Sequence, residues 1–139
     1  MKSINDYDYS NKTVLLRIDI NSPIDPLTKK IVSDNRIRKS IPTIRTLLDK
    51  GAKLVMIAHQ GDTLDYSNLI SLHEHAEKLS QYLGSTVPYI DDPCGPAAQQ
   101  KIKTLRAGEG ILLGNLRYLT EEISTFENAV KLEPKDMKD

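Results

Sequence analysis

Polar side chains that could hold a small anion follow three apolar runs of the sequence, each at the point where the run ends. They are Asp19 and Asn21, His59 and Gln60, and Asn115 and Arg117. Guanidinium, imidazole and amide groups together suit an anion that carries carboxylate and phosphate, because arginine offers planar, forked donors to such groups. A plainer interpretation of the first pair stays open, since Asp and Asn also bond their own backbone in a turn such as the one before Pro23.

Two more arginines, Arg36 and Arg38, lie at the start of a helical pattern and can add positive charge to the same site. Several candidates also have a structural interpretation. Arg17, inside the first apolar run, suits an ion pair, Arg38 suits a solvated helix position, and His59 suits a hydrogen-bonded place in the core. We favour the functional interpretation because these residue types coincide at the ends of several runs.

The apolar runs predict strands, and the segments between them predict helices. Strands are expected from Thr13 onward, with burial on both faces and with Asp19 and Asn21 at the polar carboxyl end, and at 52–58, 86–90 and 110–113. Helices are expected at 35–49, 72–83 and 97–105, the first divided at Pro42 into a short helix and a longer one. This alternation predicts an α/β fold, a three-layer sandwich with a parallel, Rossmann-like sheet and helices on both faces. The carboxyl ends of such strands meet at one edge, where ligands bind.

The composition of the 139 residues excludes several classes of protein. Lys and Arg number 19, as do Asp and Glu, so the formal net charge is zero and nothing points to nucleic acid or a membrane surface as a partner. The single cysteine, Cys94, excludes an internal disulfide framework, and no apolar stretch approaches the roughly 18 residues of a membrane span. The first ten residues are too polar for a signal peptide, so we expect a cytoplasmic protein.

Four segments of the chain resemble the N-terminal domain of phosphoglycerate kinases, in the same order and over nearly the whole length. They are VLLRIDINSPID, DNRIRKSIPTIRTLLDKGAKLVMIAHQGD, DDPCGPAA and GILLGNLRYLTEE. The forms INSPIDPLTKK and AHQ are closer to archaeal members. The resemblance implies reversible phosphoryl transfer between 1,3-bisphosphoglycerate and ADP, giving 3-phosphoglycerate and ATP, in glycolysis and gluconeogenesis.

The resemblance also implies roles for five residues in binding 3-phosphoglycerate. Asp19 and Asn21 match residues at the carboxylate and hydroxyl end of the substrate. Arg36 matches the catalytic arginine, which contacts the substrate and stabilises the phosphoryl group in transit, while His59 and Arg117 match the pocket for the substrate phosphate. The resemblance implies no metal ligand and no bound cofactor in this chain, because Mg²⁺ with ADP or ATP belongs to the C-terminal domain of the family.

We therefore expect residues 1–139 to be a partial N-terminal, substrate-binding domain of a longer two-domain kinase, whose C-terminal nucleotide-binding domain is absent from this chain. The sequence has no glycine-rich loop followed by Lys and no carboxylate motif for a metal. By itself the chain should bind an anion without transferring a phosphoryl group. The implied partners are 3-phosphoglycerate and the missing domain, and the implied complete enzyme is a monomer.

Two residues depart from the family pattern. Asp62 stands where the family has an arginine after the second strand. Gly114 stands where a glutamate is usual, and we expect this change to loosen the strand end that presents Arg117. Both changes also fit an alternative, a divergent, non-catalytic anion-binding or regulatory paralogue that kept the fold.

The acid at position 62 gives a first test of the anion site. If the pocket of Arg36, His59 and Arg117 receives a phosphate, an acid in the same loop repels it. We expect Asp62→Arg to tighten 3-phosphoglycerate binding by about tenfold to a hundredfold, because attraction replaces repulsion between close charges. The gain should shrink as salt rises, since an open pocket is screened. Titration calorimetry at two ionic strengths measures both effects. Unchanged or weaker binding would mean either that Asp62 lies away from the ligand or that the ligand is a different molecule.

Overall fold

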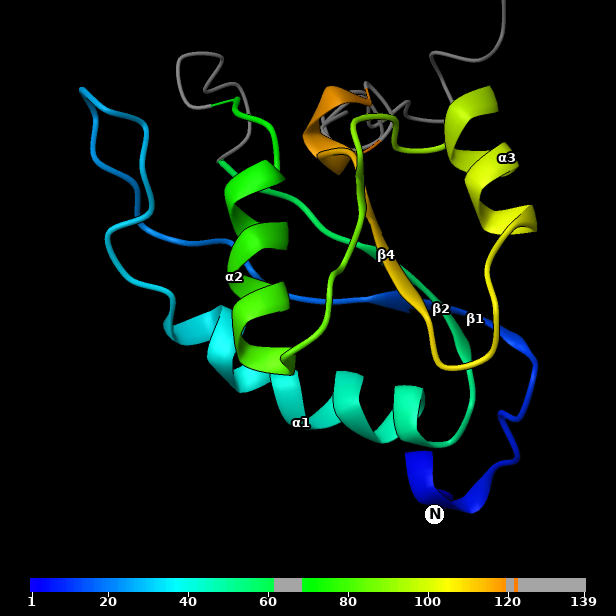
Figure 1. The fold of residues 1–139 in the computed structure, drawn as a ribbon. Coiled ribbons are helices and arrows are strands. Elements are labelled where there is room, and N and C mark those ends of the chain that lie inside the picture. Colours follow the sequence, from blue (N-terminus) through cyan, green and yellow to red (C-terminus); the bar gives the residue numbers. More distant parts are fainter. Residues whose placement is uncertain (62–68, 120–121, 123–139) are drawn as a thin grey trace, which may run out of the picture.

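Strands and helices alternate along the chain (Figure 1). The computed structural model describes residues 1–61, 69–119 and 122. The elements in chain order are η1 Ile4–Asp6, β1 Thr13–Arg17, α1 Asn35–Asp49, β2 Lys53–Ile57, α2 His73–Leu83, β3 Tyr89–Ile90, α3 Pro96–Lys103, β4 Gly110–Leu113 and η3 Leu116–Tyr118. Within that described part, no helix has both the length and the apolar character that a membrane span needs.

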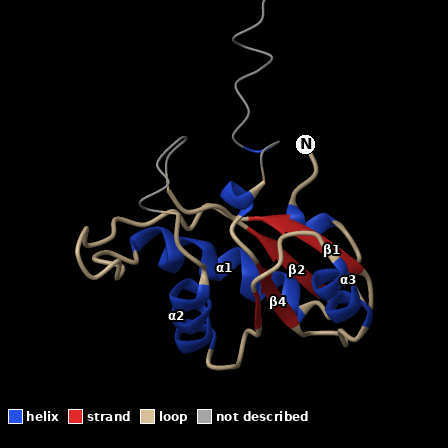
Figure 2. Cartoon of the chain, turned by 90° about the horizontal axis from the view of Figure 1, so that it is seen from above, coloured by secondary structure: helices blue, strands red, loops and turns tan. Residues whose placement is uncertain are grey.

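The four strands form one parallel sheet in the order β1-β2-β4-β3. α1 and α2 pack on one face through a core that includes Ile37, Leu79 and Leu112, and α3 packs on the other through Ala98 against Val55. In Figure 2, α1 and α2 lie on the left, and α3 lies on the right beside the strands. The chain crosses the sheet from β1 to β3 and returns to β4, so right-handed connections require α3 on the opposite face. The predicted three-layer α/β fold is confirmed.

α1 runs unbroken from Asn35 to Asp49, so the expected division at Pro42 is wrong. A proline inside a helix removes one hydrogen bond, at a typical cost of about 3 kcal/mol. Ile37 before it, and Ile44 and Leu47 after it, are all buried. Burying each such side chain contributes roughly 1.5–3 kcal/mol. Burial on both sides of the proline therefore outweighs the lost bond.

β1 lies at an edge of the sheet, because β2 is its one neighbour among the described strands. Val14 and Leu16 pack toward the core under α1 and α2, whereas Leu15 is 66% exposed on the face where α3 covers Val55. The expected burial of this strand on both faces is therefore wrong, since an apolar run does not distinguish an edge strand from a central one. By contrast, β4 is buried at every position, and the short β3 lies at the other edge of the four strands that the structure describes, as Pro88 predicts.

Gly114, directly after β4, allows two segments to approach each other closely. Its amide donates to the carbonyl of Asp92 at 3.3 Å. A Cβ atom at position 114 would lie 2.8 Å from the backbone nitrogen of Asp92 and 3.1 Å from that of Pro93, closer than such atoms normally come. Gly114 therefore packs the end of the strand against the turn at 91–93, and the expectation that it loosens this end is wrong.

His75 stands in the apolar stripe of α2 and is completely buried. Burial, with a smaller effect from the positive charge of Lys78, lowers the pKa of His75 from 6.5 to about 4. The ring is therefore neutral at pH 7. Unfolding would return it to water and to its ordinary pKa.

The close approach at Gly114 predicts a position-specific loss of stability. We expect Gly114→Ala to lower the free energy of unfolding by about 1–3 kcal/mol, the usual effect of overpacking, because the backbone of Asp92 has to move. Gly110→Ala, at the start of the same strand, is the control and should cost less. Its new Cβ would first meet side-chain carbons of Leu48 and Met56, at 3.4 Å. Urea unfolding of the three proteins measures the difference, and equal losses at the two positions would contradict the close approach.

Because His75 is buried and neutral, we expect the free energy of unfolding to fall as the pH drops from 7 to 5. The unfolded chain takes up a proton near the ordinary pKa of 6.5, whereas the folded chain takes it up near a pKa of about 4, so stability rises with pH between these values. The free energy of unfolding should fall by about 2 kcal/mol between pH 7 and pH 5. His75→Gln cannot titrate and should lose much less over this range. Urea unfolding at pH 7, 6 and 5 compares them, and parallel curves would rule out a buried neutral histidine.

Candidate functional site

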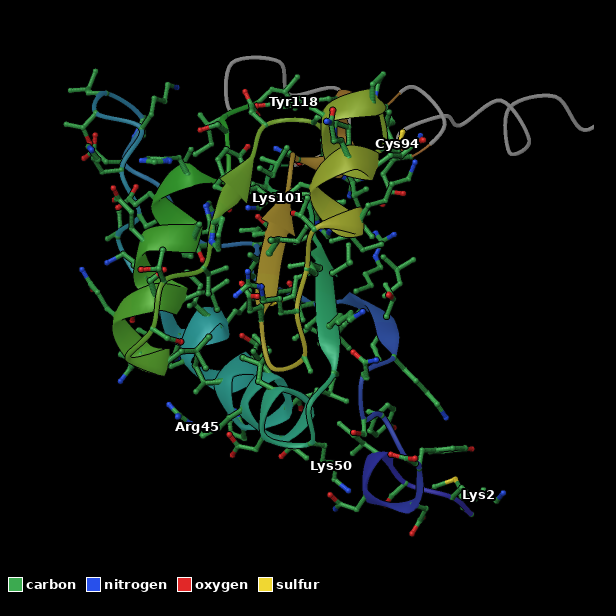
Figure 3. All side chains as sticks on the ribbon, turned by 45° about the vertical axis from the view of Figure 1, so that its right-hand side comes forward. Lys2, Arg45, Lys50, Cys94, Lys101 and Tyr118 are labelled. Atoms are coloured by element: carbon green, nitrogen blue, oxygen red, sulfur yellow. The ribbon has the colours of Figure 1, made fainter. Side chains whose placement is uncertain are left out.

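β1, β2 and β4 end at the same edge of the sheet because they are parallel. Figure 3 shows Tyr118 at the end of the molecule where β4 stops, while Arg45 and Lys50 lie at the opposite end. The candidate binding residues follow the three strands on the side of Tyr118. This edge is therefore where the structure can bring them together.

From Arg17, the last residue of β1, the side chains keep alternating between the core and the surface. The core-facing set is Ile18, Ile20 and Ser22, and the outward set is Arg17, Asp19 and Asn21. The amide of Ile18 still bonds the carbonyl of Ile57 at 3.0 Å, so the segment leaves the sheet in line with the strand. The alternation places Asp19 and Asn21 on one side of the chain, away from the core.

Arg36, in the first turn of α1, forms an ion pair with Asp19. The distance between Nη1 of Arg36 and Oδ1 of Asp19 is 3.1 Å, and more than half of each side chain is exposed. The same oxygen accepts the amide of Asn21 at 3.3 Å. A groove of about 320 Å³, lined also by Lys39 and Ser40, opens beside the pair. The structure thus brings Asp19, Asn21 and Arg36 together.

A second group of charges surrounds His59, which follows β2. Arg17 pairs with both carboxylate oxygens of Glu122, one of them at 3.3 Å, so its structural interpretation as an ion-paired residue is supported. Nη1 of Arg117 donates to the carbonyl of Glu122 at 3.3 Å. Partial burial lowers the pKa of His59, and the positive charges of Arg117 and Arg17 lower it further. The neutral ring can accept one hydrogen bond and donate another.

Arg38 does not join these groups. Its Nε lies 3.2 Å from Oδ1 of Asp34, the residue before α1, and Asp34 also accepts a hydrogen bond from the hydroxyl of Tyr82 in α2. More than half of the Arg38 side chain is exposed. Arg38 therefore keeps its interpretation as a solvated helix residue.

Gln60 and Asn115 lie beneath the site, with 3% and 0% of their surface exposed. The amide of Gln60 donates to Oδ1 of Asn115 at 3.1 Å, and Nδ2 of Asn115 donates to the carbonyl of Gln60 at 3.0 Å. Asn115 also donates to the carbonyl of Ile70 at 2.9 Å and accepts the amide of Arg117 at 3.0 Å. Both polar atoms of the Asn115 side chain are hydrogen-bonded to backbone groups, so this side chain supports the site instead of binding a ligand.

The side chain of Gln60 joins two further segments. Its Oε1 accepts the amide of Ser22 at 2.9 Å, and its Nε2 donates to the carbonyl of Ser22 at 2.9 Å. Nε2 of His75 lies 2.9 Å from the same Oε1 and therefore carries the hydrogen of that ring. Sequence reasoning missed Ser22 and His75 as parts of the site. The available signal was a polar residue, His75, inside an apolar helical stripe, where it needs a buried partner.

Asp62 lies outside the described residues, so its place in the anion pocket stays a prediction. The charged segment 120–139 lies outside them as well, apart from Glu122. Among the residues that the structure describes, no group of three or more His, Cys, Asp or Glu side chains could hold a metal ion.

Comparison with known proteins identifies relatives by sequence. The family model for phosphoglycerate kinase matches residues 4–137. The phosphoglycerate kinase of Sulfurisphaera tokodaii is 48% identical over 120 residues, which are 86% of this chain and 29% of the relative. That of Thermococcus onnurineus is 45% identical over 123 residues, which are 88% of this chain and 29% of the relative. Both relatives are archaeal, so the archaeal character of the resemblance is confirmed.

Solved structures agree with the sequence comparison. The crystal structure of phosphoglycerate kinase from Pyrococcus horikoshii aligns with a TM-score of 0.83 at 43% identity and covers 89% of this chain and 30% of its own. The enzyme from Coxiella burnetii aligns with a TM-score of 0.67 at 28% identity and covers 83% of this chain and 28% of its own. The chain thus spans less than a third of these relatives. Because the family model covers nearly all of it, this chain belongs to the phosphoglycerate kinase family.

Proposed function

We propose that this chain is the phosphoglycerate-binding part of a kinase that transfers a phosphoryl group reversibly between 1,3-bisphosphoglycerate and ADP, forming 3-phosphoglycerate and ATP. The observation that carries the proposal is the pair of Arg36 and Asp19, 3.1 Å apart at the carboxyl edge of the sheet, in a chain of this family. Carboxylate and phosphate ligands are bound well by such forked donors. The comparisons give no support to the alternative of a non-catalytic paralogue.

Each candidate residue has chemistry suited to one part of the substrate. Oδ1 of Asn21 accepts the amide of Gly61 at 3.2 Å, which leaves its Nδ2 as a donor for the substrate carboxylate. Asp19 can accept a substrate hydroxyl. His59 and Arg117 suit the substrate phosphate, and Nε of Arg117 is buried without a hydrogen-bond partner among the described residues. A buried donor of this kind is stabilised by an anion.

Arg36 is the residue that we propose as catalytic. In phosphoryl transfer, negative charge spreads over the equatorial oxygens of the moving group, so positioning and electrostatic stabilisation contribute most. A guanidinium can bind two such oxygens at once. No covalent nucleophile is required, so this mechanism gives the exposed Cys94 no role.

The remaining parts of the reaction lie, in this proposal, outside the chain. Residues 1–139 would be part of an N-terminal domain, and Mg²⁺ with ADP or ATP would bind to a C-terminal domain that closes over the substrate. Among the described residues, no group of three or more His, Cys, Asp or Glu side chains could hold a metal ion. The net charge of zero gives no reason to expect a nucleic-acid or membrane partner. The complete enzyme of this proposal is cytoplasmic and monomeric.

Substitution of Arg36 tests its role in binding. We expect Arg36→Ala to weaken 3-phosphoglycerate binding by about tenfold to a hundredfold, because hydrogen bonds to charged groups contribute about 1.5–3 kcal/mol. Arg36→Lys should recover little, since one ammonium cannot replace a planar fork. Arg38→Ala is the matched control, because Arg38 lies in the same helix and pairs with Asp34. Titration calorimetry compares the proteins, and equal affinities of the two alanine variants would make Arg36 a structural residue.

Turnover separates catalysis from binding in a complete enzyme that contains this chain. There, Arg36→Ala should lower kcat far more than it raises KM, because the contact is stronger in the transition state than in the bound substrate. Steady-state kinetics with 3-phosphoglycerate and ATP measure both constants. Small, equal changes in the two would limit Arg36 to a structural role.

A further inference from the structure

Four buried polar side chains stand directly behind the candidate substrate-binding residues. They are Ser22, Gln60, His75 and Asn115, with 5%, 3%, 0% and 0% of their surface exposed. Three of them adjoin binding residues along the chain: Ser22 follows Asn21, Gln60 follows His59, and Asn115 precedes Arg117 by two positions. His75 is different, because it belongs to α2 and is distant in sequence from every binding residue.

We propose that His75 is a positioning residue for phosphoglycerate binding, which acts through its buried hydrogen bond to Gln60. The bond ties the ends of β1 and β2 to α2, and so fixes where Asn21 and His59 face the ligand. This inference rests on the proposed function, and it assigns to the same site a residue that does not touch the substrate.

The side chain of Gln60 makes the coupling directional. Its Oε1 and Nε2 match the N–H and the carbonyl of Ser22, both at 2.9 Å, so a flipped amide would oppose like groups at both contacts. Nε2 of His75 donates its hydrogen to the same Oε1, and the nitrogen and oxygen atoms are 2.9 Å apart. Because α2 is packed into the core through Leu79, this bond anchors Gln60, and with it Ser22, to a rigid element.

The position of His75 is better explained by this bond than by packing alone. Its Nδ1 is buried and makes no hydrogen bond to any described residue, and a buried acceptor without a donor destabilises a fold. An apolar side chain of similar size would avoid that penalty. A histidine here therefore costs stability and provides one donor, directed at Gln60.

Three substitutions in α2 separate positioning from stability. His75→Met removes the donor and keeps an unbranched side chain of similar size. His75→Gln keeps an amide donor that can reach Gln60. Leu83→Ala is the control, because Leu83 lies two turns further along the same helix and is 8% exposed. Titration calorimetry with 3-phosphoglycerate measures the affinity of each variant, and urea unfolding measures its stability.

We expect His75→Met to raise the Kd about tenfold, the effect of one lost buried hydrogen bond, without a matching loss of stability. His75→Gln should stay close to the wild-type Kd, and Leu83→Ala should lower stability and leave the Kd unchanged. A wild-type Kd for His75→Met, or an equal rise for Leu83→Ala, would overturn the proposal. If His75→Met does not fold, His75→Leu takes its place, and failure of both to fold would make His75 a folding residue and overturn the proposal too.

Amide hydrogen exchange tests the same coupling without a ligand. The amide of Ser22 is bonded to the side chain of Gln60, outside any strand or helix, so its protection reports on that side chain. This amide should exchange about tenfold faster in His75→Met than in the wild type. In His75→Gln its exchange rate should return close to the wild-type rate. If the wild type does not bind 3-phosphoglycerate, the proposed function fails, but exchange still decides the positioning role. Unchanged exchange at Ser22 in His75→Met would overturn it.

Discussion

The edge of the sheet that carries the site depends on two buried amide side chains. Where parallel strands end, the chain leaves the sheet and its backbone groups lose their neighbours, yet here several of them stay out of water. Gln60 and Asn115 replace those neighbours, because a primary amide offers donors and an acceptor at once. An apolar residue at either position would leave backbone groups unpaired, at a cost of about 1–3 kcal/mol for each group.

This constraint separates the residues that support the site from those that face solvent. An extended segment turns successive side chains to opposite sides, so a buried supporting residue must adjoin an exposed one. Ser22 is buried beside the partly exposed Asn21, and Gln60 is buried beside the partly exposed His59. The same backbone bonds that satisfy the interior therefore also set the direction of the outward side chains.

Features set by local patterns were predictable from the sequence, and features set by distant partners were not. The three helices and the shared edge of the strand ends follow from the spacing of apolar residues, which is a local property. The exposure of Leu15 depends on how many strands flank β1, and the continuity of α1 through Pro42 depends on the core beneath it. The sequence places Gln60 and Asn115 at the ends of two strands but does not show that they are buried. Their burial depends on hydrogen bonds to Ser22 and Ile70, which are distant in sequence.

Arg36, the proposed catalytic cation, has an anionic partner within the chain, and this arrangement bears on how an anion would bind. It pairs with Asp19, and more than half of each side chain is exposed. Exposed pairs usually contribute less than about 1 kcal/mol, whereas hydrogen bonds from arginine to phosphate are charge-assisted and often bidentate. A phosphoryl group can therefore draw the arginine away at small cost, and the carboxylate stays close enough to accept a hydroxyl of the same ligand. Before a ligand binds, the ion pair with Asp19 holds Arg36 at the edge of the sheet. Ligand binding therefore removes less side-chain entropy from Arg36.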